Sequence, residues 1–138
     1  MKPAIKVITL GVGDLERSLA FYRDGLGLPT EGIVGTEFEG GAVAFFELSD
    51  GLILALWPRR ELAKEARLEA GPAGRAQFSI GHNVGSKEEV DEVLGQARAA
   101  GAMIPAEPQD RAWGGYSGYF EDPDGHLWEV AWNPQLLP

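Results

Sequence analysis

The chain has 138 residues, of which 44% are hydrophobic and 24% are charged, as is ordinary for a globular protein. It has no cysteine, which excludes disulfides, thiolate metal sites and cysteine nucleophiles. A formal net charge of −9 would repel nucleic-acid phosphates, and no apolar run approaches the roughly 20 residues that span a bilayer. The first residues lack the apolar run of a signal peptide, so we expect a cytoplasmic location.

The first half of the chain predicts a strand, a helix and then further strands. Alternation of β-branched and small residues over 5–12 indicates the strand, and Asp14 lies at the position expected for the N-cap of the helix. Apolar residues spaced three or four apart continue the helix until glycines and a proline end it near residue 27. A short exposed helix is expected at 61–69. It follows strands expected at 32–38, 42–48 and 52–57, the last two joined by an Asp-Gly turn.

The second half repeats this order after a Gly-Pro-Ala-Gly linker at 71–74. Ser86 follows a predicted strand at 77–84 and forms a capping-box pattern with Glu89, which begins a helix that ends at Gly101. The remainder predicts a short strand at 102–105, a Pro/Gly-rich loop at 107–115 and a closing hairpin of 116–121 and 126–132.

Two sequence matches indicate that the halves arose by duplication. Val12-Gly13-Asp14 matches Val84-Gly85-Ser86 at an offset of 72, and Phe46-Glu47 with Asp50-Gly51 matches Phe120-Glu121 with Asp124-Gly125 at an offset of 74. Each half has one helix for three or four strands, so its sheet buries only one face under that helix. Pairing of the halves, within a chain or across a dimer, would curl the sheets round a shared cavity.

Two segments resemble signatures of the vicinal oxygen chelate family, which includes glyoxalase I, extradiol dioxygenases and metal-free drug-sequestering proteins. The opening signature is Gly11-Val12-Gly13-Asp14-Leu15-Glu16-Arg17-Ser18, with Phe21-Tyr22 and Leu26-Gly27. The closing one is Gly118-Tyr119-Phe120-Glu121-Asp122-Pro123-Asp124-Gly125-His126-Leu127-Trp128-Glu129.

The resemblance implies an α+β fold in which tandem βαβββ modules form a curled mixed sheet around a cavity. We therefore expect a single glyoxalase-like domain over residues 1–138. It would consist of module 4–57 and module 75–133, joined by linker 58–74.

The resemblance also implies where a metal would be held. Metal-using members place one ligand on the first and last strand of each module, and the corresponding positions here are Val7, Ala55, Ser79 and Glu129. Only Glu129 is a good ligand, whereas a divalent cation needs about three or four His or carboxylate ligands. We expect no metal and no other cofactor, since the chain also lacks a dinucleotide-binding fingerprint.

The two histidines are poor substitutes for the missing ligands. His82 is three residues from Ser79 and His126 is three from Glu129, and an odd separation along a strand puts side chains on opposite faces. Each is therefore expected as a hydrogen-bonded strand or turn residue. A metal-dependent glyoxalase- or dioxygenase-like enzyme with unrecognised ligands stays open as an alternative.

Glu129 is the candidate catalytic residue. In the family geometry its carboxylate faces the cavity, where it would act as a general base, pair with a ligand ammonium, or be a relic satisfied by Ser79 and water. Aromatic side chains suit planar or cationic ligands. Trp57 shares the strand parity of Ala55, and Trp113 and Tyr116 flank a glycine-rich segment that a pocket lid would use. The predicted ligand-binding set is Val7, Ala55, Trp57, Ser79, Trp113, Tyr116 and Glu129.

These observations favour a metal-independent small-molecule-binding protein of the glyoxalase/bleomycin-resistance type that works as a homodimer. Sequestration of a cationic aromatic compound is the candidate role. The rival is a lyase or isomerase with Glu129 as its general base, so the sequence leaves open whether the protein is an enzyme. The expected partners are a small-molecule ligand and a second copy, with no nucleic acid and no membrane.

Overall fold

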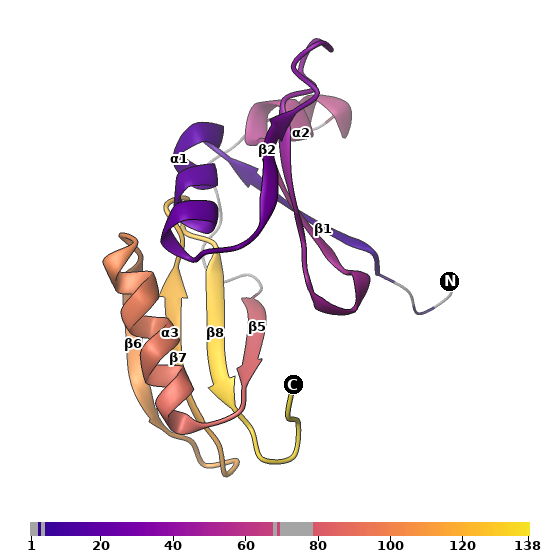
Figure 1. Ribbon diagram of the computed structural model, residues 1–138. Helices are drawn as coiled ribbons and strands as arrows, with labels where there is room; N and C mark the ends of the chain where they lie inside the picture. The colour runs from indigo at the N-terminus through magenta and orange to yellow at the C-terminus, as the bar shows by residue number, and fades with distance from the viewer. Residues whose placement is uncertain (1–2, 4, 68, 70–78) are drawn as a thin grey trace. The chain divides into compact units, whose positions relative to one another are not determined.

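The computed structural model describes residues 3, 5–67, 69 and 79–138, and the chain divides into two units, Met1–Pro72 and Ala73–Pro138 (Figure 1). Each unit has one four-stranded sheet with both parallel and antiparallel neighbours. Mixed sheets with few helices confirm the predicted α+β class. No helix among the described residues is both long and apolar enough to cross a membrane.

The strand order in the first unit is β1-β4-β3-β2, with β1 (Val7–Val12) parallel to β4 (Ile53–Pro58) and antiparallel pairing elsewhere. Asp14 caps α1 as predicted, since its Oδ1 accepts a hydrogen bond from the backbone N–H of Arg17 at 3.1 Å. The remaining elements are α1 (Leu15–Leu19), the π-helical η1 (Ala20–Gly25), β2 (Thr30–Val34), β3 (Val43–Glu47), the 3₁₀ turn η2 (Ser49–Gly51) and α2 (Arg59–Glu65).

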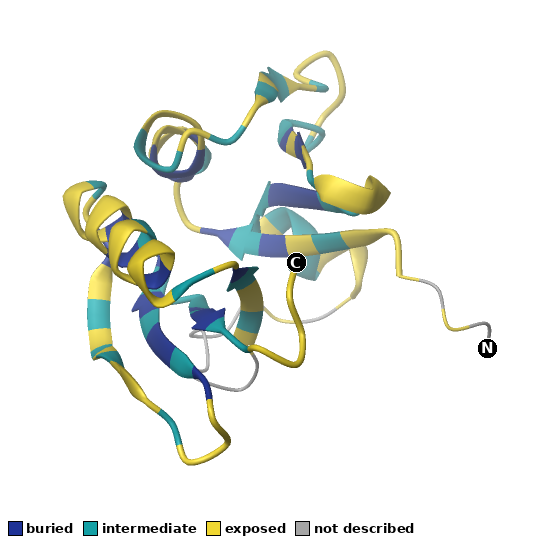
Figure 2. Cartoon of the chain, turned by 60° about the horizontal axis from the view of Figure 1, so that its bottom comes forward, coloured by how far each residue is buried: buried dark blue, intermediate teal, exposed yellow. Residues whose placement is uncertain are grey.

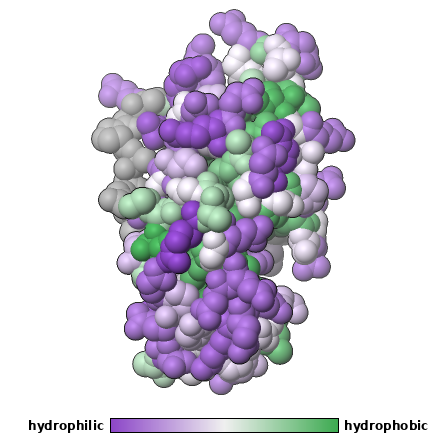
Figure 3. All heavy atoms as spheres, turned by 60° about the vertical axis from the view of Figure 1, so that its left-hand side comes forward, coloured by the Kyte–Doolittle hydropathy of each residue, from purple (hydrophilic) through white to green (hydrophobic). Residues whose placement is uncertain are grey.

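The second unit repeats this plan in the order β5-β8-β7-β6, under one long helix, α3 (Lys87–Ala99). Ser86 caps α3, because its Oγ accepts a hydrogen bond from the backbone N–H of Glu89 at 3.2 Å. One side of this helix is buried and the other exposed, and hydrophilic side chains gather over it (Figures 2 and 3). The strands are β5 (Ser79–Val84), β6 (Met103–Asp110), β7 (Tyr116–Glu121) and β8 (Leu127–Trp132).

The pairing register of the two sheets confirms the internal repeat. Val7 pairs with Ile53 in the first sheet, and Ser79 pairs with Leu127 in the second. Ser79 lies 72 residues after Val7, and Leu127 lies 74 residues after Ile53, the two offsets found in the sequence. The β3–β4 pair of Phe45 with Ala55 maps in the same way, at 74 for both partners, onto the β7–β8 pair of Tyr119 with Glu129. Each position on one sheet therefore has a defined counterpart on the other.

Each sheet buries the face that its helix covers. On the first sheet Leu10, Phe46 and Leu56 are almost completely buried, and the ring of Tyr22 in η1 lies 5.9 Å from that of Phe46. We call the other side the open face. By strand alternation, the open face of the first sheet carries Val7, Thr9, Phe45, Glu47, Ile53, Ala55 and Trp57. That of the second carries Ser79, Gly81, Asn83, Ser117, Tyr119, Glu121, Leu127, Glu129 and Ala131.

Several predicted element boundaries are wrong. The strand expected at 5–12 begins at Val7, and the short helix expected at 61–69 is Arg59–Glu65. Strand β6 continues to Asp110, so the predicted loop at 107–115 shrinks to residues 111–115. Its prolines are tolerated because β6 is an edge strand that pairs only with β7, in an irregular register. Strand β2 ends at Val34, where glycines with positive φ begin a turn, and β8 begins at Leu127 instead of His126. The predicted linker at 71–74 and residues 77–78 lie outside the described residues.

Candidate functional site

The open face of the first sheet brings together three of the predicted ligand-binding residues. Ala55 on β4 pairs with Phe45 on one side and Thr9 on the other, and Val7 lies two residues before Thr9 on β1. Val7 is 44% exposed and Phe45 is 45% exposed, whereas Ala55 is buried at 2%. Trp57 follows on the same face of β4. Apart from Glu47 at its end, the surface formed by these strands is uncharged.

Two hollows lie over this face. The smaller holds about 280 Å³ and is lined by Thr9, Gly41, Val43, Phe45, Ala55 and Trp57. The larger, of about 680 Å³, shares Phe45 and extends over β2 to Pro29. The indole N–H of Trp57 donates to the backbone oxygen of Gly40 at 2.8 Å, which fixes the ring against the loop between β2 and β3. The smaller hollow suits an apolar or aromatic group.

On the second sheet, Ser79 and Glu129 share the open face but are not directly opposite each other. Ser79 pairs with Leu127, whereas Glu129 lies between Gly81 on β5 and Tyr119 on β7. The hydroxyl of Tyr119 donates a hydrogen bond of 3.0 Å to Oε2 of Glu129. Tyr119, which the sequence reasoning did not include in the site, is therefore the side chain that holds this carboxylate.

Arg111 covers the other side of Tyr119. Its Nε donates to the hydroxyl of Ser117 at 2.9 Å, its terminal nitrogen donates to the backbone oxygen of Ser117 at 3.0 Å, and its guanidinium carbon lies 5.8 Å from the centre of the Tyr119 ring. Burial raises the pKa of the Tyr119 phenol, the hydrogen bond to Glu129 raises it further, and Arg111 opposes both. The phenol is thus held protonated as a donor to Glu129.

Tyr116 lies away from this carboxylate, and Trp113 lies in the loop before β7. Tyr116 is on the helix-covered face, where its hydroxyl donates to Asp91 of α3 at 2.8 Å and the ammonium of Lys87 lies 5.5 Å from its ring centre. Trp113 is 50% exposed in the loop before β7. Its ring packs against Gly115, since a Cβ added to Gly115 would lie 1.9 Å from the nearest carbon of the indole. The structure therefore does not bring Tyr116 onto the open face with Glu129.

The residues at the positions where the family resemblance implies metal ligands do not fit a divalent cation. On the first sheet the two expected ligand positions are Val7 and Ala55, which offer no donor atom, and on the second they are Ser79 and Glu129. A hydroxyl and a tyrosine-bonded carboxylate fall short of the three or four strong ligands required.

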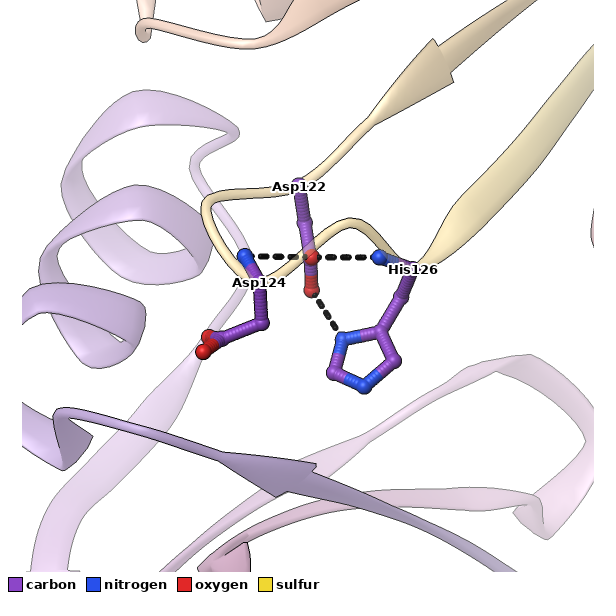
Figure 4. A group of neighbouring side chains, drawn as sticks. All are labelled: Asp122, Asp124 and His126. Carbon is purple, nitrogen blue, oxygen red and sulfur yellow. Dashed lines mark hydrogen bonds and ion pairs between the residues drawn. The ribbon is translucent and has the colours of Figure 1, made fainter. Parts of the chain in front are cut away.

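Within the described residues, one group of three side chains has metal-ligand spacing: Asp122, Asp124 and His126 in the β7–β8 turn (Figure 4). Asp122 is 3% exposed, and its Oδ1 accepts hydrogen bonds from the backbone N–H groups of Asp124 at 2.9 Å and His126 at 2.8 Å. Its Oδ2 lies 2.7 Å from Nδ1 of His126. These contacts fold the hairpin and confirm His126 as a turn residue.

His82 lies on the helix-covered face of the second sheet, opposite Val130, as strand parity predicts. Burial lowers the pKa of its imidazole, and the nearby carboxylate of Glu89 raises it by less. Because Ser79 and Glu129 point to the other side of the sheet, His82 does not complete their donor set.

Comparison with known proteins gives consistent matches. The family model for the Glyoxalase/Bleomycin resistance protein/Dioxygenase superfamily matches residues 4–130. The uncharacterized protein YraH of Bacillus subtilis (strain 168) is 29% identical over 126 residues, which cover 89% of this chain and 93% of YraH.

Solved structures agree over nearly the whole chain. The crystal structure of a glyoxalase-related enzyme from Fulvimarina pelagi has a TM-score of 0.82 and 32% identity, and the match covers 96% of this chain and 89% of that one. A lactoylglutathione lyase from Agrobacterium tumefaciens has a TM-score of 0.70 and 26% identity, with 95% and 94% covered.

Proposed function

Since the chain belongs to the glyoxalase/bleomycin resistance protein/dioxygenase superfamily, we propose that it binds a small organic molecule on the open faces of its sheets without a metal. One observation carries the proposal. Of the four side chains at the positions where the family resemblance implies metal ligands, only Glu129 is a good metal ligand. Its Oε2 already accepts a hydrogen bond from Tyr119. The proposed ligand contacts are Val7, Ala55, Trp57, Ser79 and Glu129.

The ligand we propose is a cationic aromatic compound. A net charge of −9 attracts cations at long range. Phe45 and Trp57 offer aromatic surface beside the hollow of about 280 Å³ on the first sheet. Separately, Glu129 offers a carboxylate on the open face of the second sheet. Sequestration, in which the protein only holds the compound, needs no further chemistry. Ligand contact by Trp113 and Tyr116 stays a prediction; the hydroxyl of Tyr116 is bonded to Asp91 of α3.

Tryptophan fluorescence tests this function. Chelator-treated protein is titrated with cationic aromatic compounds, among them a bleomycin-type drug, and saturable quenching is expected at the same affinity before and after chelation. The Trp57→Phe variant loses most of the quenching. The matched Trp132→Phe variant keeps it, because Trp132 lies on the helix-covered face beside Lys87. Absence of quenching by every compound, or quenching only after a divalent metal is added, contradicts the proposal.

The functional unit we propose is a homodimer. Static light scattering of the purified chain is expected to give about twice the monomer mass of 14.9 kDa. A monomer at all concentrations contradicts this part of the proposal and leaves ligand binding to be judged by the fluorescence titration.

A second candidate function is a lyase or isomerase in which Glu129 is the general base. The observation that favours it is the phenol of Tyr119, which donates to one carboxylate oxygen and leaves the other able to accept a proton. General-base catalysis typically contributes about 10²–10⁴-fold to a rate. For any compound that the protein turns over, Glu129→Gln is then expected to lower kcat by that range with little change in KM. An unchanged kcat excludes the role.

A further inference from the structure

Gly81 leaves the backbone of β5 bare beside the carboxylate of Glu129. The two residues are direct partners across the β5–β8 ladder. Among the described residues, a Cβ built on Gly81 would meet only Oδ1 of Asn83, at 3.9 Å, so this part of the structure leaves the space beside it open. The φ of Gly81 lies outside the left-handed region, so the backbone is ordinary. At the equivalent place on the first sheet, Thr9 stands beside Ala55. We call the space between Gly81 and Glu129 the notch.

The carboxylate beside the notch is held from one side only. Tyr119 donates to its Oε2 from β7, and this is the single hydrogen bond to the Glu129 side chain within the described part of the chain. The second oxygen keeps its capacity to accept. Glu129 is partly buried, where a hydrogen bond to a carboxylate is stronger than it is in water. A ligand that brings an N–H into the notch would add a second donor to this carboxylate.

The polar groups around the notch are already committed. Arg111 donates to Ser117 and stacks over Tyr119, and Asn83 donates from its side-chain nitrogen to the backbone oxygen of Leu136 at 3.0 Å. The neighbours of the notch on β5 and β8, Ser79 and Leu127, carry no charge and no ring. From these two strands the notch is therefore faced by one carboxylate and by no aromatic ring.

We propose that the notch selects an ammonium group that carries at least one N–H, so that the ligand is a primary or secondary amine; this rests on the proposed function. A charge-assisted N–H···O bond to a carboxylate is roughly twice as strong as a neutral one. A quaternary ammonium has no N–H to donate and is instead recognised by aromatic faces, which β5 and β8 do not offer to the notch. A neutral alcohol can donate but gains no charge assistance.

Three probes of matched shape test this selection: benzylamine, benzyltrimethylammonium and benzyl alcohol. Each is titrated into the ¹⁵N-labelled full chain, and amide shifts are followed by NMR. Benzylamine is expected to shift the amides of Ser79, Gly81 and Glu129 and to bind at least tenfold more tightly than the other two. Equal affinities for the three probes overturn the proposal. So does the absence of shifts at Gly81 and Glu129 when benzylamine is raised to roughly 50 mM, which is above the millimolar dissociation constants of weak ligands.

Two variants locate the binding. Gly81→Thr fills the notch with the side chain that the first sheet has at this place, and Glu129→Gln removes the charge but keeps the shape. Both are expected to weaken benzylamine at least tenfold. Gly95→Ala is the matched control, since a Cβ on this α3 glycine meets nothing within 4 Å and the site is unaffected. Wild-type affinity in Glu129→Gln overturns the proposal even if Gly81→Thr fails to fold.

The outcomes separate this inference from the proposed function. If benzylamine shifts only amides around Trp57 and Thr9, or if aromatic compounds quench tryptophan without any preference for amines, small-molecule binding stands and the role of the notch is rejected. If benzylamine binds at the notch but the fluorescence titration finds no drug-sized ligand, the recognition site stands and sequestration is rejected.

Discussion

The phenol of Tyr119 donates a hydrogen bond of 3.0 Å to the carboxylate of Glu129 across two neighbouring strands. The phenol of Tyr119 has a pKa above its ordinary value of 10.0, first because of burial and then because its proton is donated to the carboxylate. Removing the negative charge of Glu129 takes away the second cause and leaves the first. The pair is therefore testable from the tyrosine side, without any ligand.

In Glu129→Gln, the pKa of Tyr119 is expected to fall toward 10 but to stay above it. The measurement is an NMR titration of the ¹³Cζ resonances of the tyrosines. Tyr116 is the internal control, because its pKa is raised by its own hydrogen bond to Asp91 and its neighbouring carboxylates do not include Glu129. A Tyr119 titration that does not move, or a Tyr116 titration that moves equally, contradicts the coupling of the pair.

At the level of elements, the sequence predicted the order of strands and helices but not the register of the closing hairpin. A strand beginning at His126 would imply a four-residue loop over Asp122–Gly125, which places Gly118 opposite Glu129. Asp122 instead draws His126 into the turn through its backbone and imidazole, and the N–H of Asp122 donates to the oxygen of His126 at 3.0 Å. This one-residue change places Tyr119 opposite Glu129.

The start of α3 was predictable because a cap is local. Ser86 Oγ accepts from the backbone N–H of Glu89, as the capping-box pattern indicates, whereas the Glu89 carboxylate accepts from the backbone N–H of Gly85 at 3.0 Å. Register and edge-strand length, by contrast, depend on partners distant in sequence. The prolines of β6 favour a loop, and only its position at the sheet edge explains why they occur in a strand.

Loss of the α3 cap is expected to destabilise the protein. Replacing Ser86 by Ala removes the acceptor of the Glu89 N–H, and such substitutions cost about 1 kcal/mol of unfolding free energy. Urea denaturation followed by circular dichroism measures the change. Ser49→Ala is the control, because Ser49 is exposed in η2 and a surface substitution of this kind typically changes stability by less than about 0.5 kcal/mol. Equal losses in both variants would rule out the cap as the cause.

For the whole molecule, duplication explains why the fold was readable from the sequence and the site only in part. The repeat fixes which positions of the two sheets correspond, so the expected ligand positions on one sheet could be transferred to the other by offset. It does not fix which side chains occupy the corresponding positions of the two halves. The pair Phe45–Ala55 is apolar, whereas its counterpart Tyr119–Glu129 is polar and hydrogen-bonded. The equivalent positions Thr9 and Gly81 also differ. These differences between the two halves make their open faces chemically different.

The stability of the whole chain is expected to be greatest between about pH 6.5 and 10. His82 has a lowered pKa in the fold, so the unfolded chain binds its proton first, and stability falls as the pH drops below the ordinary value of 6.5. Tyr116 and Tyr119 have raised pKa values, so the unfolded chain loses their protons first, and stability falls as the pH rises above 10.0.

Urea midpoints at pH 5.5, 8 and 10.5, the outer two chosen about half a unit to one unit beyond those ordinary values, measure both limbs. His82→Gln is expected to lose less stability than the wild type between pH 8 and 5.5, since the side chain that must take up a proton is gone. Tyr119→Phe is expected to lose less between pH 8 and 10.5, because no phenol remains to ionise at that position. His82→Gln should not change the loss of stability between pH 8 and 10.5, and Tyr119→Phe should not change the loss between pH 8 and 5.5. If either variant loses as much stability as the wild type over the range assigned to its own residue, that residue is ruled out as the cause.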